Sequence, residues 1–510
     1  MLRNIVSKFI VNEYKIKYLI FSIISGIFLA LSFQKFNFFF LAWVAFIPLI
    51  YCIYKNDLKY SLLYGSVTGI TYSLIAFNWM YLFLLKNTSS ILDSFVVSII
   101  AWTILSLYFV VWTVFLKILK KINKFILILF APALWVTFEY VRNYYFGSFP
   151  INLLGYSQSS FIYIIQCADI FGVYGISFVV ILINFLLFYW LYNRNKKYLI
   201  SAFLIISLLL VYGFIRINQM PKINNEDGIK IGVVQPNIEQ KNKFKKQYIK
   251  KILYDLKQIG TSFENKNLDL ILYPETVLPK NIYENQNVKD FVNKISQLSK
   301  HTLIGGFDIE NYKVYNSIFI VSDDGEVIDS YKKKHLILFG EYIPFEGLLA
   351  RMLSKHITNN NLTKEIELKV FKFDKYTLGI NICSENYYPY LSRELVLKGA
   401  SLLTTHSNDA WCDGLSYPYQ HFVMNIFRSI ENRKYLIVAS NTGISGVIAP
   451  TGRVVRQTKN QERICFEEIV YTNNYITIYD RIGDLFVYLC ILYVALILLI
   501  YGIFLKRKNV

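Results

Sequence analysis

The sequence predicts two different parts: a multi-pass α-helical membrane domain of about eight helices, and an α/β domain built as a sheet sandwich with mixed strand pairing. Of the 510 residues, 54% are hydrophobic and 17% aromatic. This composition is too apolar for an ordinary soluble enzyme of this length. Long apolar runs fill residues 1–216, whereas residues 217–484 alternate between strand-like and helix-like segments. The change of pattern places the α/β domain between two membrane-spanning parts.

Each apolar run is close to or above the ~20 residues that a helix needs to cross the hydrocarbon core of a bilayer. The approximate bounds are 18–34, 37–54, 61–85, 91–116, 125–146, 165–192, 198–215 and 485–505. The run 125–146 contains Pro132, Glu139 and Arg142, so a bent or re-entrant segment is an alternative there. The basic N-terminal stretch also allows a cleaved signal peptide, but the spans that follow at once favour a retained helix.

The formal net charge is +19, and the basic residues lie largely between the apolar runs. That distribution indicates membrane topology rather than nucleic-acid binding. Among the short segments that flank or join the spans, the alternate loops hold Lys35, Lys86 and Arg142, and the other set holds sixteen basic residues: Arg3, Lys8, Lys15, Lys17, Lys55, Lys59, Lys117, Lys120, Lys121, Lys124, Arg194, Lys196, Lys197, Lys506, Arg507 and Lys508. The positive-inside rule then puts both termini in the cytoplasm. Residues 217–484 are expected on the other side, which in a bacterium is the periplasmic face of the inner membrane.

Three domains are expected on this basis: an N-terminal membrane domain of about seven spans (1–216), a candidate catalytic domain outside the cytoplasm (217–484), and a last span with a cytoplasmic tail (485–510). In the middle domain, alternation of apolar residues predicts strands and helices. The expected strands are 229–234, 268–273, 302–306, 317–321, 327–330, 377–382, 436–440 and 445–450, and the expected helices are 239–259, 288–298 and 419–433.

The cysteine pattern excludes two common small-protein frameworks. The chain has six Cys, with no CxxC pair and no Cys/His spacing typical of a metal site. This predicts neither a disulfide scaffold nor a zinc centre, and no metal or other cofactor is expected. A disulfide between Cys412 and Cys465 stays open, because a single pair cannot be predicted from sequence.

Glu275, Cys383 and a run of lysines could take part in catalysis, and each lies beside a predicted strand. Glu275 follows a buried strand in LDLILYPET, Cys383 ends another in YTLGINICSEN, and a lysine run precedes GEY. A Cys nucleophile needs a base and a donor for the oxyanion. A Glu can be the base, and a Lys can lower the thiol pKa and hold the oxyanion.

Each of these side chains also has a structural interpretation. Cys383 could be a buried, inert residue, and Glu275 could be an exposed polar end of a strand. The lysine run could be a solvated loop or a patch that binds anionic lipid. A Cys–His pair with His335 or His421 is a further alternative, although neither lies in a recognisable protease signature.

The chain resembles the bacterial apolipoprotein N-acyltransferase family over nearly its whole length. The motifs that carry the resemblance together are YPET, KHLILFGEYIPFE and SNDAW. In that family a nitrilase-like αββα domain, of the carbon–nitrogen hydrolase superfamily, is inserted before the last of eight membrane helices. The resemblance implies that Cys383 is the nucleophile, Glu275 the general base and Lys333 the stabiliser of the thiolate and oxyanion. Lys333 is chosen because it stands eight residues before Glu341, and Lys332 and Lys334 are the neighbouring alternatives. Glu341 and Glu385 match further acids near the site.

The chain departs from the family at several positions, and other residues are expected to contact substrate. Ser384 stands where the family usually has Tyr, Phe244 where it usually has Trp, and Leu338 where Pro is frequent. The expected substrate-binding residues are Phe244, Ser384, Asn408 and Trp411. The stretch 344–357 is expected to be either an arm that dips into lipid or a helix packed on its own domain.

The resemblance also implies a two-step acyl transfer. A phospholipid gives an acyl chain to Cys383 as a thioester, and the α-amine of a diacylglyceryl-Cys at the N-terminus of a lipoprotein takes it. The expected partners are these two substrates and the bilayer, with no nucleic acid, and the protein is expected to be a monomer. The main alternative is a membrane-anchored carbon–nitrogen hydrolase (amidase) that uses water. A transporter with an outer binding domain and a catalytically silent lipoprotein-binding relic are the others.

Overall fold

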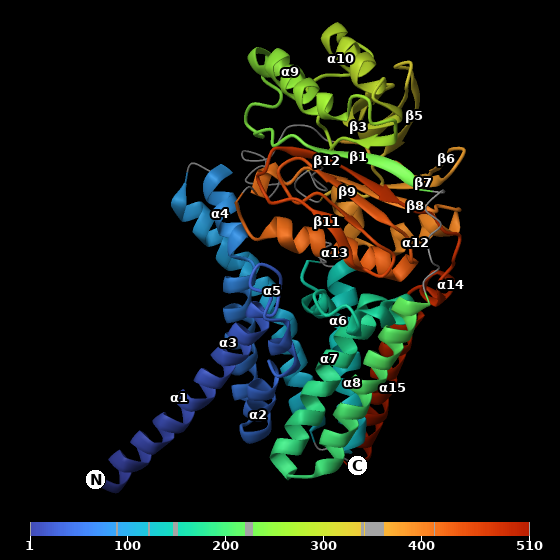
Figure 1. Cartoon of the computed structure of the whole chain (residues 1–510). Coiled ribbons are helices and arrows are strands. Elements are labelled where there is room, and N and C mark those ends of the chain that lie inside the picture. The colour runs from blue at the N-terminus through green and yellow to red at the C-terminus, as the bar shows by residue number, and fades with distance from the viewer. Residues whose placement is uncertain are drawn as a thin grey trace. The chain divides into compact units, whose positions relative to one another are not determined.

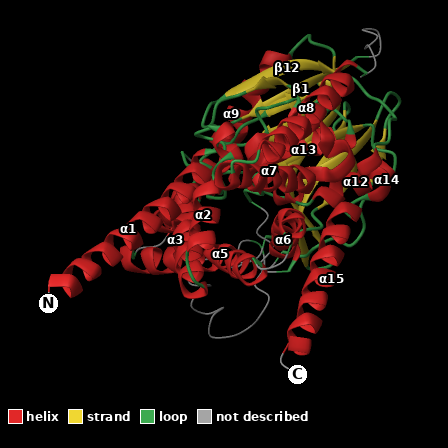
Figure 2. Ribbon diagram, turned by 90° about the horizontal axis from the view of Figure 1, so that it is seen from below, coloured by secondary structure: helices red, strands yellow, loops and turns green. Residues whose placement is uncertain are grey.

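The structure is a computed structural model of the chain. It describes residues 2–87, 90–120, 123–145, 151–219, 228–337, 341, 362–412 and 414–508. The chain forms two compact units, one made of Met1–Ile215 with Asp484–Val510 and the other of Arg216–Gly483. Figure 2 shows that helices dominate the first unit, whereas the strands of the described residues belong to the second.

The first unit consists of apolar helices joined by short connections. Its elements are α1 (Leu2–Leu31), η1 (Phe39–Trp43), α2 (Ile47–Lys55), α3 (Leu58–Ala76), α4 (Asn78–Asn87), α5 (Ile91–Leu119), α6 (Lys124–Tyr144), η2 (Leu154–Gln158), η3 (Ile164–Cys167), α7 (Ala168–Asn193), α8 (Lys196–Asn218) and α15 (Leu485–Lys508). Five helical segments of the described chain are long and apolar enough to cross a membrane: 91–119, 124–144, 164–193, 196–218 and 485–504. A sixth is added if α3 and α4, which are bent by 51° at their junction, count as one span.

These findings confirm a multi-pass helical part, with five or six candidate spans in the described residues. The expected number of eight stays a prediction. The segment Phe39–Lys55 is apolar but shorter than a full span. The run that contains Pro132 forms the single helix α6, as expected for a span, rather than the bent or re-entrant segment that was its alternative.

Two features of the helical unit show how polar and small residues are used inside it. Gly65 and Gly69 of α3 face α5 so closely that an added Cβ would lie 2.5 Å from Thr113 Oγ1 and 2.7 Å from Ser106 Cβ, respectively. Small residues four apart are a usual device for close helix packing in membranes.

Glu139 of α6 accepts hydrogen bonds from Trp135 Nε1 (3.0 Å) and the Leu154 amide (2.6 Å), so this buried acid is bonded within the protein.

The second unit contains two six-stranded sheets with helices on their outer faces (Figure 1). The sheet orders are β12-β1-β2-β3-β4-β5 and β11-β10-β9-β8-β7-β6. The strands are β1 (Ile229–Gln235), β2 (Leu268–Leu272), β3 (Ser299–Glu310), β4 (Lys313–Ser322), β5 (Val327–Lys332), β6 (Val370–Lys372), β7 (Thr377–Ile382), β8 (Leu402–Ser407), β9 (Leu436–Ser440), β10 (Gly446–Ile448), β11 (Val454–Gln457) and β12 (Ile464–Val470). Parallel pairs at the centre of each sheet and antiparallel pairs at the edges confirm the predicted mixed pairing.

Amphipathic helices cover the two sheets. The helices α9 (Ile249–Gly260) and α10 (Gln286–Ser296) bury their apolar faces against the first sheet, in one cluster that also contains Ile271 and Phe319. The helices α12 (Pro389–Leu397) and α13 (Tyr417–Asn432) pack on β7 and β9 of the second. The short helix α14 (Ile478–Ile482) closes the unit. The layers are therefore helix, sheet, sheet, helix, the αββα sandwich that the resemblance implies.

Two local differences from the predicted elements affect the site. The helix expected over 239–259 begins only at Ile249, and residues 239–248 form turns and a short 3₁₀ segment, η5 (Lys246–Tyr248). Lys243 lies in those turns and is fully buried, which a continuous solvated helix would not allow. The strand expected over 302–306 extends over Ser299–Glu310 and forms a hairpin with β4, in which Asn311 and Tyr312 both have positive φ.

Candidate active site

The ends of three strands bring the predicted catalytic residues together. Glu275 comes three residues after β2, Lys333 directly after β5 and Cys383 directly after β7. All three side chains are buried, with Lys333 1% exposed and Cys383 2% exposed. Lys333 Nζ lies 3.4 Å from Glu275 Oε1 and 2.9 Å from Glu341 Oε1. The site thus combines one buried ammonium, two carboxylates and a thiol.

Of the three adjacent lysines, Lys333 is the one whose ammonium enters this cluster. Lys332 turns the other way and pairs with Glu310 at 2.6 Å. Lys334 contributes its backbone N–H, which donates to Glu385 Oε1 at 2.7 Å. Burial by itself lowers the pKa of Lys333, but the neighbouring Glu341 and Glu275 outweigh it and the pKa is raised. Lys333 therefore carries a positive charge in the folded protein.

Asn316 on β4 is a member of the site that the sequence did not single out. Its Nδ2 donates to Glu275 Oε1 at 2.6 Å and to Glu341 Oε1 at 3.0 Å. The two carboxylates therefore share two donors, Asn316 and Lys333. Nothing in the linear sequence marks this Asn, since it lies in the middle of an apolar strand and reaches the site only through sheet pairing.

Cys383 is held in a strained turn. It has φ +50° and opens the 3₁₀ turn η7 (Cys383–Tyr387), a conformation that non-glycine residues seldom adopt. Burial raises the pKa of its thiol well above the ordinary value, Glu275 raises it further, and Lys333 opposes them. The resting thiol is thus protonated, and a proton acceptor must act before it can attack as a thiolate.

Glu385 connects the turn of Cys383 with the segment that carries Lys333. It is fully buried and accepts hydrogen bonds from the amides of Ile382 (2.7 Å), Lys334 (2.7 Å) and His335 (3.2 Å) and from the hydroxyl of Tyr331 (3.0 Å). Burial raises the pKa of Glu385 to about 7, against the lowering effect of these N–H donors. These hydrogen bonds join the turn of Cys383 to the segment of Lys333. Glu385 therefore fixes the distance between the Cys383 thiol and the Lys333 ammonium.

Lys243 is the second residue that the sequence interpretation missed. Its side chain is fully buried, and its Nζ donates to Thr276 Oγ1 at 2.8 Å and to the Glu275 carbonyl oxygen at 3.4 Å. Burial lowers the pKa of Lys243 to about 7, and Glu275 opposes that shift. Thr276 has φ +45°, so Lys243 braces a strained turn beside Glu275. In the sequence this lysine is one of a charged run and looks solvated.

The expected substrate-binding residues lie in different surroundings. The ring of Phe244 is 42% exposed and lies 5.8 Å from that of Phe307. Asn408 is buried and donates to Gln240 Oε1 at 3.0 Å, so its amide supports the segment that leads to Phe244. Ser384 is buried, and its hydroxyl has no hydrogen-bond partner among the described residues.

The ring of Trp411 is tilted against that of Tyr417, with ring centroids 4.6 Å apart. Leu338 and the expected arm, 344–357, lie outside the described residues. Contact of Phe244, Ser384, Asn408 and Trp411 with substrate stays a prediction.

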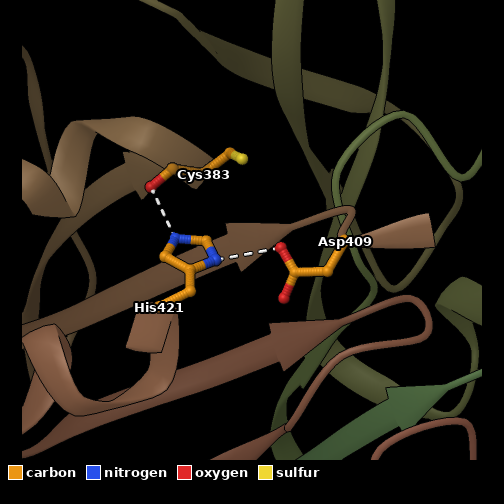
Figure 3. A group of neighbouring side chains, drawn as sticks. All are labelled: Cys383, Asp409 and His421. Atoms are coloured by element: carbon orange, nitrogen blue, oxygen red, sulfur yellow. Dashed lines mark hydrogen bonds and ion pairs between the residues drawn. The ribbon is translucent and has the colours of Figure 1, made fainter. Parts of the chain in front are cut away.

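The two histidines weighed as partners for Cys383 make other bonds. The His335 ring contacts the Tyr390 hydroxyl, and burial lowers the pKa of His335 to about 4. The His421 ring reaches the backbone carbonyl oxygen of Cys383 at 3.3 Å, and Figure 3 marks no hydrogen bond between the ring and the Cys383 sulfur.

Side-chain atoms of Cys383, Asp409 and His421 lie within 4.8 Å of one another, as in a metal site. Both ring nitrogens of His421, however, face hydrogen-bond acceptors, which fits a hydrogen-bonded group better than a set of metal ligands. Cys465 directs its Sγ to the carbonyl oxygen of Ile259 at 3.3 Å.

Comparison with known proteins covers both units. Residues 25–186 match the apolipoprotein N-acyltransferase N-terminal domain family, and residues 230–472 match the carbon–nitrogen hydrolase family. A protein of Geobacter metallireducens named apolipoprotein N-acyltransferase is 30% identical over 489 residues, which is 92% of this chain and 92% of that protein. A protein of the same name from Rickettsia prowazekii is 30% identical over 75% of this chain and 78% of its own. The chain therefore belongs to the apolipoprotein N-acyltransferase family.

Proposed function

We propose that this protein transfers an acyl chain from a membrane phospholipid to the N-terminal amine of a diacylglyceryl-modified lipoprotein, through a thioester on Cys383. The observation that carries this proposal is the meeting of Cys383, Lys333 and Glu275 at the ends of three strands. A buried thiol with a raised pKa, beside a carboxylate and a charged ammonium, has the parts needed to form and stabilise an acyl-enzyme.

In the first step, Glu275 takes the proton of the Cys383 thiol. The thiolate sulfur attacks the carbonyl carbon of a phospholipid ester, and the ammonium of Lys333 stabilises the oxyanion. The carbon–oxygen bond of the ester then breaks. The lysophospholipid alkoxide leaves with the proton that Glu275 had taken, and the acyl group remains on sulfur.

In the second step, the α-amine of the modified N-terminal Cys of a lipoprotein attacks the thioester. Glu275 accepts the proton that this nitrogen loses, and the carbon–sulfur bond breaks. Glu275 returns the proton to Cys383, and the amide product departs. Lys333 stays charged through both steps, because Glu341, 2.9 Å from its Nζ, remains beside it while Glu275 takes up and returns the proton.

The proposed location follows from the charge pattern and the candidate spans. The multi-pass helical unit holds the chain in a bacterial inner membrane, with both termini in the cytoplasm and residues 217–484 on the periplasmic side. Both substrates are lipids or carry lipid, so they reach such a site by diffusing in the membrane plane. Phe244, which is apolar and partly exposed, is proposed to contact their acyl chains.

Intact-mass measurement of the purified protein, incubated with phosphatidylethanolamine and no acceptor, tests the first step. The wild type is expected to gain one acyl group that hydroxylamine or an amine-terminated diacylglyceryl peptide removes. Cys383→Ala is the matched control and gains none.

Two other results would contradict the proposal. Absence of an adduct on a thiol that is shown to be intact would sink the thioester mechanism. Loss of the adduct to water as fast as to the peptide would instead favour the amidase alternative.

A further inference from the structure

His421 of α13 lies directly behind the turn of Cys383 and has no part in the mechanism above. The side chain is 2% exposed. Its Nδ1 is 2.9 Å from Asp409 Oδ1, and its Nε2 is 3.3 Å from the Cys383 carbonyl oxygen and 3.2 Å from Asn386 Oδ1. Figure 3 shows the ring between the carboxylate on one side and the backbone of Cys383 on the other.

The hydrogen bonds of this ring determine its protonation. All three partners offer oxygen lone pairs: a carboxylate, a backbone carbonyl and the oxygen of an amide. The Nδ2 of Asn386 donates to the backbone oxygen of His421 at 3.5 Å, so the Oδ1 of Asn386 faces the ring. A neutral imidazole has a single N–H, so its other nitrogen would turn a lone pair toward an acceptor. Only the imidazolium can donate a hydrogen bond from each ring nitrogen to the acceptor that this nitrogen faces.

The charged surroundings agree with this form. Asp409 supplies the compensating negative charge, and Glu275 is the other carboxylate that acts on the ring. Among the described residues, the Cys383 thiol and the phenol rings of Tyr387 and Tyr417 are further titratable groups near it; each phenol ring centroid lies 5.4 Å from that of His421. Burial lowers the pKa of His421, but Asp409, the Cys383 carbonyl oxygen and Glu275 together raise it by more, and the net shift is upward.

A second buried histidine shows the opposite pattern. His406 Nδ1 donates to the Tyr273 carbonyl oxygen at 2.7 Å, and its Nε2 is 3.2 Å from the Thr404 hydroxyl, which can donate to it. One N–H is enough for that arrangement. Burial lowers the pKa of His406 to about 4, whereas the pKa of His421 is shifted upward.

We propose that His421 is a positioning residue: held as an imidazolium by Asp409, it clamps the nucleophile turn by donating to the Cys383 carbonyl oxygen and Asn386 Oδ1. The inference rests on the proposed role of Cys383 as nucleophile. The clamp matters because Cys383 has φ +50°, a conformation that persists only where surrounding contacts hold it. Gly443 belongs to the same arrangement, since a Cβ there would lie 2.1 Å from Asp409 Oδ2.

The protonation is tested on the full chain, labelled with ¹⁵N-histidine, in lipid-free detergent micelles. The chain has five His, so the ring nitrogens can be assigned with single variants. At pH 7 the signals that vanish in His421→Gln are expected to be those of an imidazolium, with both nitrogens protonated. The signals that vanish in His406→Gln are expected to be those of a neutral ring. A neutral tautomer at His421 in the wild type would overturn the proposal.

The positioning role is tested by the rate of Cys383 acylation in a single turnover. Asp409→Asn keeps the shape of the side chain but removes the charge, so His421 should become neutral and lose one donor. The acylation rate constant is expected to fall about 10- to 100-fold, with the apparent KM for phospholipid unchanged, because a small misplacement of a nucleophile has that effect. The acylation rate constant of His421→Gln, which retains one donor, is expected to lie between those of Asp409→Asn and His421→Ala.

Alkylation of Cys383 by iodoacetamide gives a readout that does not depend on acyl transfer. The rate is expected to fall about 10-fold in Asp409→Asn, with a thermal midpoint that shows a folded protein. Wild-type alkylation and acylation rates in a folded Asp409→Asn protein with a neutral His421 would overturn the clamp. If the wild type alkylates but never acylates, the proposed function fails while the alkylation rates still decide the role of His421.

Discussion

Lys333 and Lys332 are adjacent in the sequence but differ in what surrounds their ammonium groups. Lys333 is buried between Glu275 and Glu341, whereas Lys332 pairs with Glu310, whose side chain is 54% exposed. Removing one member of a buried ionic cluster leaves uncompensated charge, which costs about 3–5 kcal/mol. An exposed pair contributes about 0–1 kcal/mol.

Lys333→Gln is therefore expected to lower the free energy of unfolding by several times the effect of Lys332→Gln, and to abolish acylation of Cys383. Denaturant unfolding of both variants measures the first effect, and intact mass measures the second. Equal destabilisation by the two substitutions would show that Lys333 is not the buried cation.

Lys243 gives the protein a stability that depends on pH. The pKa of Lys243 is lowered from 10.5 to about 7 in the folded state. Between these values the unfolded chain binds the proton and the folded chain does not, so the free energy of unfolding rises with pH from about 7 to about 10. Below pH 7 the buried charge opposes folding in full.

Lys243→Met is expected to raise the unfolding midpoint in denaturant at pH 6, and this gain is expected to shrink as the pH approaches 10. Lys241→Met is the matched control, because Lys241 lies in the same segment with its side chain 75% exposed. Parallel pH profiles of the wild type and Lys243→Met would refute the lowered pKa of Lys243.

At the scale of the element, the pairing of α3 with α5 depends on two glycines. A Cβ at Gly69 would lie 2.7 Å from Ser106 Cβ and 2.9 Å from Ser106 Cα, so the two helices would have to move apart. Gly502 of α15 has no such neighbour within 4 Å. Gly69→Ala is expected to cost about 1–3 kcal/mol by overpacking.

Gly502→Ala is the control, and it is expected to leave stability unchanged or slightly raised, because Ala favours a helix by up to about 1 kcal/mol. Thermal unfolding in detergent, followed by circular dichroism, compares the two. A loss of stability as large in Gly502→Ala as in Gly69→Ala would show that the α3–α5 contact is not the cause.

The elements that the sequence predicted best are those with one clear pattern. The strand β7 has the predicted bounds, Thr377–Ile382, because an apolar run ends there at a polar turn. The segment 239–248 was predicted wrongly as helix, since its lysines suggested a solvated face. The burial of Lys243 overrides that local preference, because its ammonium is bonded to a turn more than thirty residues away.

At the scale of the whole molecule, the predicted topology places residues 217–484 and the α7–α8 connection on opposite sides of the membrane. Tyr312 is fully exposed in the β3–β4 hairpin, and Asn195 is exposed between α7 and α8. Five of the six native cysteines are buried, so single cysteines can be introduced after Cys465 is replaced with Ser.

In cells with a permeabilised outer membrane, a membrane-impermeant maleimide is expected to label Tyr312→Cys. It is expected to label Asn195→Cys only after the inner membrane is broken. Labelling of both positions in intact inner membranes would contradict the predicted orientation.

The sequence by itself determined the helical membrane part, the α/β sandwich and the family, because these depend on periodic apolar patterns and on short motifs that are local in the chain. It also pointed to Glu275 and Cys383, which stand beside predicted strands, and the family resemblance selected Lys333 from a run of three lysines. Only the tertiary structure showed that Asn316, Lys243 and His421 surround them. Asn316 and Lys243 carry no local signal, and the sequence offered His421 only as an alternative Cys–His partner. Burial and hydrogen bonds between distant segments place all three residues there, and such contacts exist only once the domain has folded.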